Sequence, residues 1–346
     1  MALIDTILKL SALKGPAGFE AEAQTTIKAL LASFMDDVTT DTLGNIIGTR
    51  RCGRDGAPKL MLDAHFDEIG FIITGAEEGF LRFAPLGGVD ARMLPASELV
   101  VLTEPPVIGV VTALPPHLLK GEEGDKTIKI EDLYLDVGLT PEEALTKVPL
   151  GTPAVYAADS RRFGDGLICG KALDNRVSVA AVLRALELIG QTPLDVDLIV
   201  LFSVQEEVGT RGAKPGAYAT FPDWCVVVDV GHAKTPDCKT PETKEQGGGV
   251  VISKGPNMNR RLTEKLQALA EAKNIQYQIG VEPDGDSGTN ARVVQVTQSG
   301  VATALVGVPL KYMHSSHEVI SVQDAEATAA LLCEIAKALK GDDRHA

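Results

Sequence analysis

Cysteine is scarce in this sequence, and no two cysteines have the spacing of a thiolate metal site. The five cysteines form an odd set without a C-x-x-C pair: Cys52, Cys169, Cys225, Cys238 and Cys333. Two of them, Cys169 and Cys225, lie in apolar runs, which is typical of small core residues. This pattern excludes a disulfide framework and a cysteine zinc site, and it favours a reducing compartment.

Basic residues and long apolar runs are also scarce. The 33 Lys and Arg residues stand against 47 Asp and Glu residues, a formal net charge of −14, so nucleic acid is not an expected partner. No run approaches the roughly 20 apolar residues of a membrane helix. The N-terminus lacks a basic segment followed by a long apolar stretch. With 346 residues, 45% of them hydrophobic, we expect a globular, cytoplasmic protein that does not bind membranes.

Helical and strand-like patterns alternate over most of the chain. Apolar residues at helical spacing predict helices over 3–13 and 20–35, and strands follow at 45–49 and 59–64. Beyond residue 164, the predicted helices are 176–189, 260–273 and 322–340, and the predicted strands are 197–204, 225–230, 275–281 and 302–308. This alternation predicts an α/β fold with a largely parallel central sheet flanked by helices.

The middle of the chain has a different texture. Between about 70 and 164, six prolines exclude long helices: Pro85, Pro95, Pro105, Pro106, Pro115 and Pro116. Short β-rich runs such as 99–102 and 107–111 lie between them. We therefore expect a small β-rich domain at 71–163, inserted into a catalytic α/β domain that consists of residues 1–70 and 164–346.

Acidic and imidazole side chains follow the apolar strand-like runs. They are His65, Asp67, Asp174, Glu206, Glu207, Asp229 and His314. Ligands of α/β sheets gather at the carboxyl ends of strands. Adjacent carboxylates such as Glu206 and Glu207 are costly to bury unless metals or strong donors neutralise them. In an extended strand the two would point in opposite directions, so that one binds a metal while the other acts on a water. Imidazoles and carboxylates converging in this way are what a two-metal hydrolase needs.

Each candidate also has a structural alternative. His65 has the features of a hydrogen-bonded structural histidine as much as those of a ligand. Asp174 precedes a helical run and is placed like an N-cap. Asp229 ends an apolar run, where a cap is the alternative, and His317 is a rival to His314. The set of candidates, taken together, favours the metal site.

Five stretches of the chain resemble the M42 metallopeptidases, the glutamyl aminopeptidases and the large tetrahedral (TET) aminopeptidases. In order, they are Asp63-Ala-His65-Phe-Asp67-Glu-Ile-Gly70, Gly170-Lys-Ala-Leu-Asp174-Asn-Arg176, Val204-Gln-Glu206-Glu207-Val-Gly209, Val228-Asp229-Val230 and Lys311-Tyr-Met-His314-Ser315. They occur in the order of the family, and the resemblance extends over essentially the whole chain, including the β-rich insertion.

The resemblance implies a dinuclear metal centre. Asp174 would bridge two divalent ions, zinc or cobalt. His65 and Asp229 would complete one site, and Glu207 and His314 the other. The two ions would act on a shared water, polarise the scissile carbonyl and anchor the free α-amine of a peptide.

The resemblance also implies roles for two further carboxylates. Asp67 would orient His65, and Glu206 would be the general base on the metal-bridging water that attacks the peptide. It further implies a cis peptide at Asp174-Asn175. The substrates would be peptides with a free N-terminus. The inserted domain would pair subunits, and the dimers would build a tetrahedral dodecamer.

The chain departs from the family in one segment. It reads Ser287-Gly-Thr289-Asn290 where members often carry an Asp at the last position, near the substrate pocket. His232 is another pocket candidate. These residues leave the preferred N-terminal side chain open. A related deacylase or carboxypeptidase, and a non-catalytic scaffold, are the alternatives to an aminopeptidase, although a scaffold would be expected to have lost a ligand or the base. A glycosidase would need two carboxyls facing each other across a sugar, which adjacent glutamates do not provide.

Overall fold

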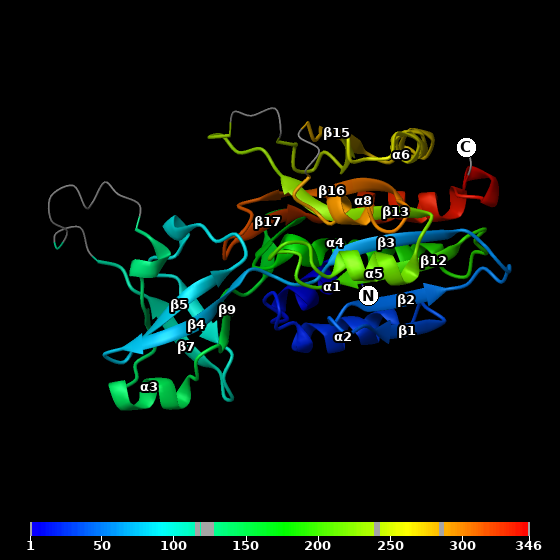
Figure 1. Ribbon diagram of the computed structural model, residues 1–346. Helices are drawn as coiled ribbons and strands as arrows, with labels where there is room; N and C mark the ends of the chain where they lie inside the picture. The colour runs from blue at the N-terminus through cyan, green and yellow to red at the C-terminus, as the bar shows by residue number, and fades with distance from the viewer. Residues whose placement is uncertain (1, 115–117, 119–127, 239–242, 284–286, 345–346) are drawn as a thin grey trace.

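The protein has an α/β body with a small β-barrel beside it (Figure 1). The structure is a computed structural model and describes residues 2–114, 118, 128–238, 243–283 and 287–344. Pro115 and Pro116, two of the prolines of the middle region, lie outside the described residues. The predicted α/β fold with a separate β-rich domain is confirmed.

The body is built on an eleven-stranded sheet in the order β1-β2-β12-β3-β13-β16-β17-β11-β10, with β14 and β15 joined to β16 off this path. The strands are β1 Asp37–Thr40, β2 Ile46–Arg50, β3 Lys59–His65, β10 Arg161–Phe163, β11 Leu167–Gly170, β12 Asp197–Ser203, β13 Trp224–His232, β14 Val250–Lys254, β15 Tyr277–Val281, β16 Ala302–Lys311 and β17 Glu318–Ser321. The central strands β12, β3, β13 and β16 are parallel to one another. The outer strands pair antiparallel, except that β14 and β15 are parallel to each other. The predicted largely parallel sheet is therefore found at its centre.

Helices cover both faces of this sheet. They are α1 Leu3–Ala12, α2 Ala21–Leu31, α4 Leu173–Ile189, α5 Ala213–Thr220, α6 Arg260–Ala272, α7 Ala291–Val294 and α8 Val322–Ala338, with a 3-10 turn, η5, at Gly341–Arg344. Alternate residues of β3 face opposite ways. Leu60 and Leu62 pack with α1, α2, α4, α6 and α8, whereas Met61 packs with α5 and α7. The sheet is thus buried between two apolar cores, one on each face.

The barrel is closed and antiparallel, in the order β4-β5-β8-β7-β6-β9. Its strands are β4 Gly70–Glu77, β5 Phe80–Leu86, β6 Glu98–Val101, β7 Val107–Val111, β8 Leu135–Asp136 and β9 Pro153–Tyr156. Helix α3 (Pro141–Lys147) and the 3-10 turns η1 (Ala91–Met93) and η4 (Ile130–Asp132) lie between them. Phe71 meets Phe83 and Tyr156 edge-on in the core. The barrel strands span 70–156, and the domain limits 71–163 stay a prediction.

Two predicted strands differ from the structure where the site is built. The strand expected at 197–204 ends at Ser203. The strand expected at 225–230 continues to His232, because it pairs with β16 along its whole length. Asp229 therefore lies within a strand and not at its end. Among the described residues, no helix combines the length and apolarity that crossing a membrane requires.

Candidate metal centre

Asp174 lies at the middle of the candidate ligands. Its turn of α4 is distorted, because Asp174 and Asn175 have non-helical backbone angles. The peptide bond between them is cis, as the resemblance implied. The Asn175 side chain donates to the Val228 carbonyl (2.9 Å), which fastens this turn to β13. The Asp174 carboxylate consequently points to two histidines instead of capping the helix.

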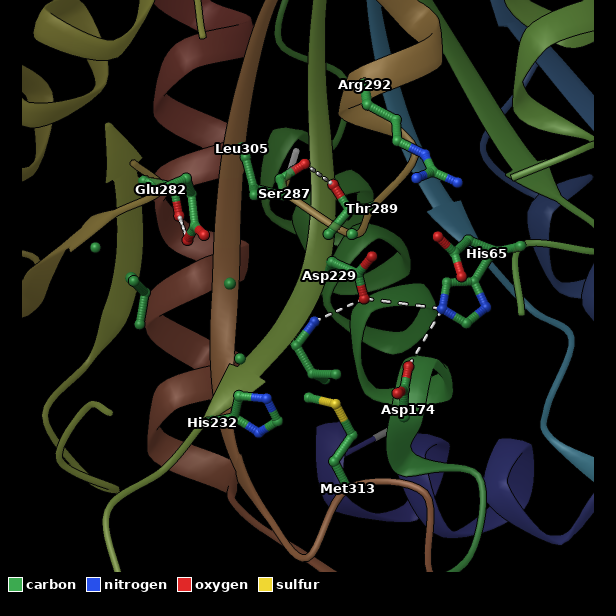
Figure 2. A pocket seen from close by; sticks show the side chains of 18 of the residues that line it. His65, Asp174, Asp229, His232, Glu282, Ser287, Thr289, Arg292, Leu305 and Met313 are labelled. Atoms are coloured by element: carbon green, nitrogen blue, oxygen red, sulfur yellow. Dashed lines mark hydrogen bonds and ion pairs between the residues drawn. The ribbon is translucent and has the colours of Figure 1, made fainter. Parts of the chain in front are cut away.

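Two groups of ligands share this carboxylate. Asp174 Oδ1 lies 3.2 Å from His65 Nε2, which is 3.8 Å from Asp229 Oδ1. Asp174 Oδ2 lies 3.2 Å from His314 Nε2, which is 3.2 Å from Glu207 Oε2. Within each group of three residues, the ligand atoms all lie within 4.8 Å of one another. Figure 2 shows His65, Asp174 and Asp229 converging from β3, α4 and β13.

Asp67 links the first histidine to the pair of glutamates. Its Oδ1 lies 3.4 Å from His65 Nδ1, on the side of the ring away from the ligand group. The same buried carboxylate accepts the backbone N–H groups of Glu206 (3.0 Å) and Glu207 (3.1 Å). The two glutamates lie in a turn beyond the end of β12. The residue before them, Gln205, has a positive φ of 55°. The alternation expected of an extended strand does not apply, and Asp67 sets their positions instead.

Glu318 is a functional residue that the sequence reasoning missed. It is 2% exposed, and its two oxygens accept the backbone N–H groups of Asp174 and His314, at 3.0 Å each. One carboxylate thus holds Asp174, which both candidate groups share, and His314 of the second group, and these two residues come from different elements. No local pattern distinguishes Glu318 from any other acidic residue at a strand start.

The charges of the ligands strongly perturb one another. Burial acts to lower the pKa of His314, yet its contacts with Asp174 and Glu207 raise that pKa to about 11. Burial likewise acts against the contacts of His65 with carboxylates, which hold its pKa well above the ordinary value. Burial acts to raise the pKa of Asp174, but the two histidines hold it below the ordinary range. The contacts between the imidazoles and the carboxylates therefore dominate the electrostatics of this cluster.

The remaining carboxylates are hard to ionise together. Burial raises the pKa of Glu206 to about 9 and that of Asp229 to about 7, and the neighbouring carboxylates add to the rise. Burial and Asp174 also raise the pKa of Glu207. Buried like charges have this effect until cations neutralise them. The site therefore favours the uptake of positive charge.

The donors of both groups suit divalent ions. They are imidazole nitrogens and carboxylate oxygens, the set that zinc and similar metals bind. Oε1 of Glu206 and Oε1 of Glu207 are buried, and neither has a hydrogen-bond partner among the described residues. Orphaned buried carboxylate oxygens are rare unless a ligand or ion satisfies them. On these grounds the residues fit two metal ions that share Asp174.

Three other predicted residues lie apart from the ligand groups. His317 is exposed, and its Nδ1 lies 2.8 Å from Ser316 Oγ. His232 lines the same cavity as the ligands. Asn290 is buried and faces the core beneath that cavity, where its amide donates to Asp63 (2.9 Å) and Ser203 (2.8 Å). The departure at Asn290 therefore affects the support of the pocket wall and not its lining.

A cavity of about 610 Å³ lies beside both ligand groups and beside Glu206. One wall comes from the loop after barrel strand β5. A Cβ on Gly88 would lie 2.9 Å from His314 Nδ1, and one on Gly87 would lie 3.2 Å from Glu207 Cβ. Glycine is thus required at Gly88 for the close approach of this loop to a ligand.

Comparisons with known proteins identify the family of the chain. The profile of the M42 glutamyl aminopeptidase family matches residues 44–331. The lysyl aminopeptidase of Pyrococcus furiosus is 33% identical, over 91% of this chain and 90% of that protein. An aminopeptidase of the archaeon Desulfurococcus kamchatkensis has a similar structure, with a TM-score of 0.92, 32% identity and coverage of 99% of this chain and 96% of the other. The Pyrococcus horikoshii TET1 peptidase, which can assemble into a tetrahedron or a large octahedral shell, has a TM-score of 0.84, 31% identity and coverage of 98% and 100%. The chain therefore belongs to the M42 aminopeptidase family of peptide hydrolases.

Proposed function

We propose that this member of the family is a dinuclear metal-dependent aminopeptidase that removes N-terminal residues from peptides. One observation carries the dinuclear part. The two oxygens of Asp174 each lie 3.2 Å from a different histidine, and each histidine belongs to its own group of three ligands. A carboxylate that serves two such groups is the bridge that a two-metal hydrolase requires.

The ligand roles follow from these groups. His65, Asp174 and Asp229 would hold one divalent ion, and Asp174, Glu207 and His314 the other, with zinc or cobalt as the expected metals. When bound, two such ions lower the pKa of a water, polarise a carbonyl and attract a free α-amine.

Glu206 is the proposed general base. It lines the cavity next to the ligands and belongs to neither ligand group. Nearby cations would favour its ionised form, which then accepts a proton from the attacking water. As the peptide C–N bond breaks, the same carboxyl returns the proton to the leaving amine. Asp67 supports this role, because it accepts the backbone N–H of Glu206 and thereby fixes the turn.

Adjacent glutamates allow a matched test. Glu206→Gln keeps the shape of the side chain but removes the proton acceptor, so both ions should stay while kcat falls by about 10²–10⁴-fold. Glu207→Gln should loosen one ion, and added metal should restore part of the activity. The measurements are bound metal per chain and kcat on an aminoacyl-anilide. Glu131→Gln, which changes an exposed carboxylate of the barrel, is the control.

Two outcomes would contradict the proposal. If Glu206→Gln loses an ion while Glu207→Gln keeps two, the roles are reversed. If elemental analysis finds at most one ion per chain in a fully active sample, the centre is not dinuclear. Zinc and cobalt are distinguished by adding each back to metal-free protein.

We also propose that the insertion at 71–163 pairs subunits and that the dimers form a tetrahedral dodecamer. The assembly of the TET1 peptidase supports this. On β7 of the barrel, Ile108 and Val110 are 63% and 44% exposed, which gives the outer face of the barrel an apolar surface suited to a partner. Such a shell would admit only unfolded peptides. Light scattering that shows an active monomer would refute the assembly, whereas a stable dimer would keep the pairing and remove the shell. The five free cysteines suit the cytoplasm as the compartment.

A further inference from the structure

The floor of the cavity is one face of the central sheet. The proposed metal ligand Asp229 on β13 is level with Gly307 on β16, which is level with Val251 on β14. Ser253 lies two residues beyond Val251 on the same face, level with Gly280 on β15. All five line the cavity. Because neighbouring strands are about 4.8 Å apart, the floor extends roughly 12 Å from Asp229 to Ser253.

This floor is apolar and lacks obstructing side chains along its length. Val251 and Leu305 supply its apolar surface. Glycine occupies two positions of the floor: Gly307 lies between Asp229 and Val251, and Gly280 lies beside Ser253. A Cβ on Gly280 would lie 3.0 Å from Val251 Cγ1 and 3.1 Å from Ser253 Oγ, so any side chain there would fill the space in front of Ser253. The floor therefore suits a long unbranched side chain.

The far end of the floor is polar and acidic. Glu282 follows β15, and its Oε1 lies 3.4 Å from Ser253 Oγ. Among the described residues that line the cavity, it is the one carboxylate outside the ligand groups and the proposed base. Figure 2 shows Glu282 on the opposite side of the cavity from His65, with the guanidinium of Arg292 extending toward His65.

Two further basic residues, His232 and Lys244, also line the cavity. Figure 2 shows His232 beside Met313, to the left of Asp174 and below Glu282. The backbone N–H of Lys244 donates to the His232 carbonyl (3.0 Å), so the two residues are neighbours. The carboxylate at the end of the apolar floor is thus that of Glu282, and its described hydrogen-bond partner is the hydroxyl of Ser253.

We propose that Glu282, together with Ser253, selects peptides whose N-terminal residue is basic, with lysine as the best fit. This inference rests on the proposed aminopeptidase function. With the α-amine at the metal groups, the four methylenes of lysine lie on the floor, and the ammonium reaches the Glu282 carboxylate and the Ser253 hydroxyl. A glutamate side chain would meet a like charge. The name of the family refers to glutamyl substrates, whereas one relative is a lysyl aminopeptidase. Because these names differ, the preference of this chain for an N-terminal side chain has to be inferred from its own residues.

The test compares substrates that differ only at the tip of the side chain. The metal-loaded protein is assayed for kcat/KM on lysyl-, norleucyl- and glutamyl-anilides, because norleucine has the lysine stem without the ammonium. Lysine should be preferred to norleucine and glutamate least favoured. Glu282→Gln should lower the lysine-to-norleucine ratio by roughly 10- to 100-fold, the worth of a hydrogen bond to a charged group. The control is Glu264→Gln, an exposed carboxylate paired with Arg260 outside this cavity, which should leave the ratio unchanged.

A second measurement separates this inference from the proposed function. Calorimetry on the same proteins compares the binding of free lysine and free norleucine, which requires no turnover. If no anilide is cleaved but lysine binds more tightly than norleucine in the original protein and not in Glu282→Gln, the proposed function fails and the pocket assignment holds. If anilides are cleaved with equal kcat/KM for lysine and norleucine, or if Glu282→Gln keeps the lysine preference, the assignment is overturned and the aminopeptidase function remains.

Discussion

Removing the Glu318 carboxylate should disturb two proposed metal ligands at once. Its oxygens accept the buried N–H groups of Asp174 and His314 at 3.0 Å each, and the side chain is 2% exposed. Glu318→Ala would leave both donors buried without an acceptor, at a cost of roughly 1–3 kcal/mol each. The free energy of unfolding should therefore fall by about 2–6 kcal/mol, a large part of the stability of an ordinary protein.

Glu318→Gln is the sharper perturbation. It keeps the volume and one acceptor oxygen, but the amide nitrogen cannot accept the second N–H, so one of the two hydrogen bonds is lost. We expect roughly half the loss of stability of the alanine variant. The affinity for metal should fall by about 10–100-fold, the usual cost when a group behind a ligand is changed.

The assay needs a control that loses the same kind of bond elsewhere. Asp324, a fully buried residue in the first turn of α8, supplies this control. Its carboxylate accepts the N–H groups of Gly247 (2.8 Å) and Gly249 (2.7 Å). Urea denaturation with a chelator present isolates the loss of stability, and competition with a chromogenic chelator gives the metal affinity. Asp324→Asn should lose stability and keep its affinity for metal. The reasoning is refuted if Glu318→Gln binds both ions as tightly as the original protein, or if the two variants lose affinity equally.

Two further predictions concern the barrel loop and the pH dependence of stability. Gly88→Ala should push the His314 ring by its new Cβ, which would lie 2.9 Å from Nδ1, and weaken the binding of one ion by about tenfold in a metal titration. Gly75→Ala, whose Cβ would have no neighbour nearer than 3.8 Å, is the control and should bind normally; equal affinities in the two variants would contradict the prediction. Burial raises the pKa of Glu20 from 4.5 to about 7, against the hydrogen bonds that its carboxylate accepts. Between these pH values the folded protein holds a proton that the unfolded chain lacks, so stability falls as pH rises, by roughly 3 kcal/mol for this group. Glu20→Gln should remove this part of the difference between urea denaturations at pH 5 and pH 8, and an unchanged difference would show that Glu20 does not titrate in this range.

The elements that hold the ligands could be predicted because their patterns are local. The apolar runs before His65 and Asp229 indicate buried strands by themselves, and the run before Glu206 does the same. The exact ends could not be predicted in this way. Gly231 and His232 are not apolar, yet β13 continues through them because β16 offers hydrogen-bond partners for the full length of the strand.

The supporting residues could not be predicted, because their roles depend on contacts between distant segments. Glu318 binds the backbone of Asp174, which is 144 positions away in the chain. Glu282 is brought to Ser253 only because β15 pairs with β14. The sequence did not predict β14, which follows a glycine-rich stretch. Helix α3 was missed for a different reason: prolines exclude long helices, but Pro141 begins a short one, with a capping box between Thr140 and Glu143.

The approach of Gly87 and Gly88 to the ligands limits how far the barrel is a separable module. The barrel is inserted between two halves of the catalytic sheet, and its loop packs against Glu207 and His314. A truncated chain without the barrel strands β4 to β9 would keep the proposed ligands His65, Asp174 and Asp229 but would lose one wall of the second ligand group. A smaller enzyme without the barrel would therefore need a new wall at this place. Mutations in the barrel that shift the loop of Gly87 and Gly88 should also change the affinity for metal.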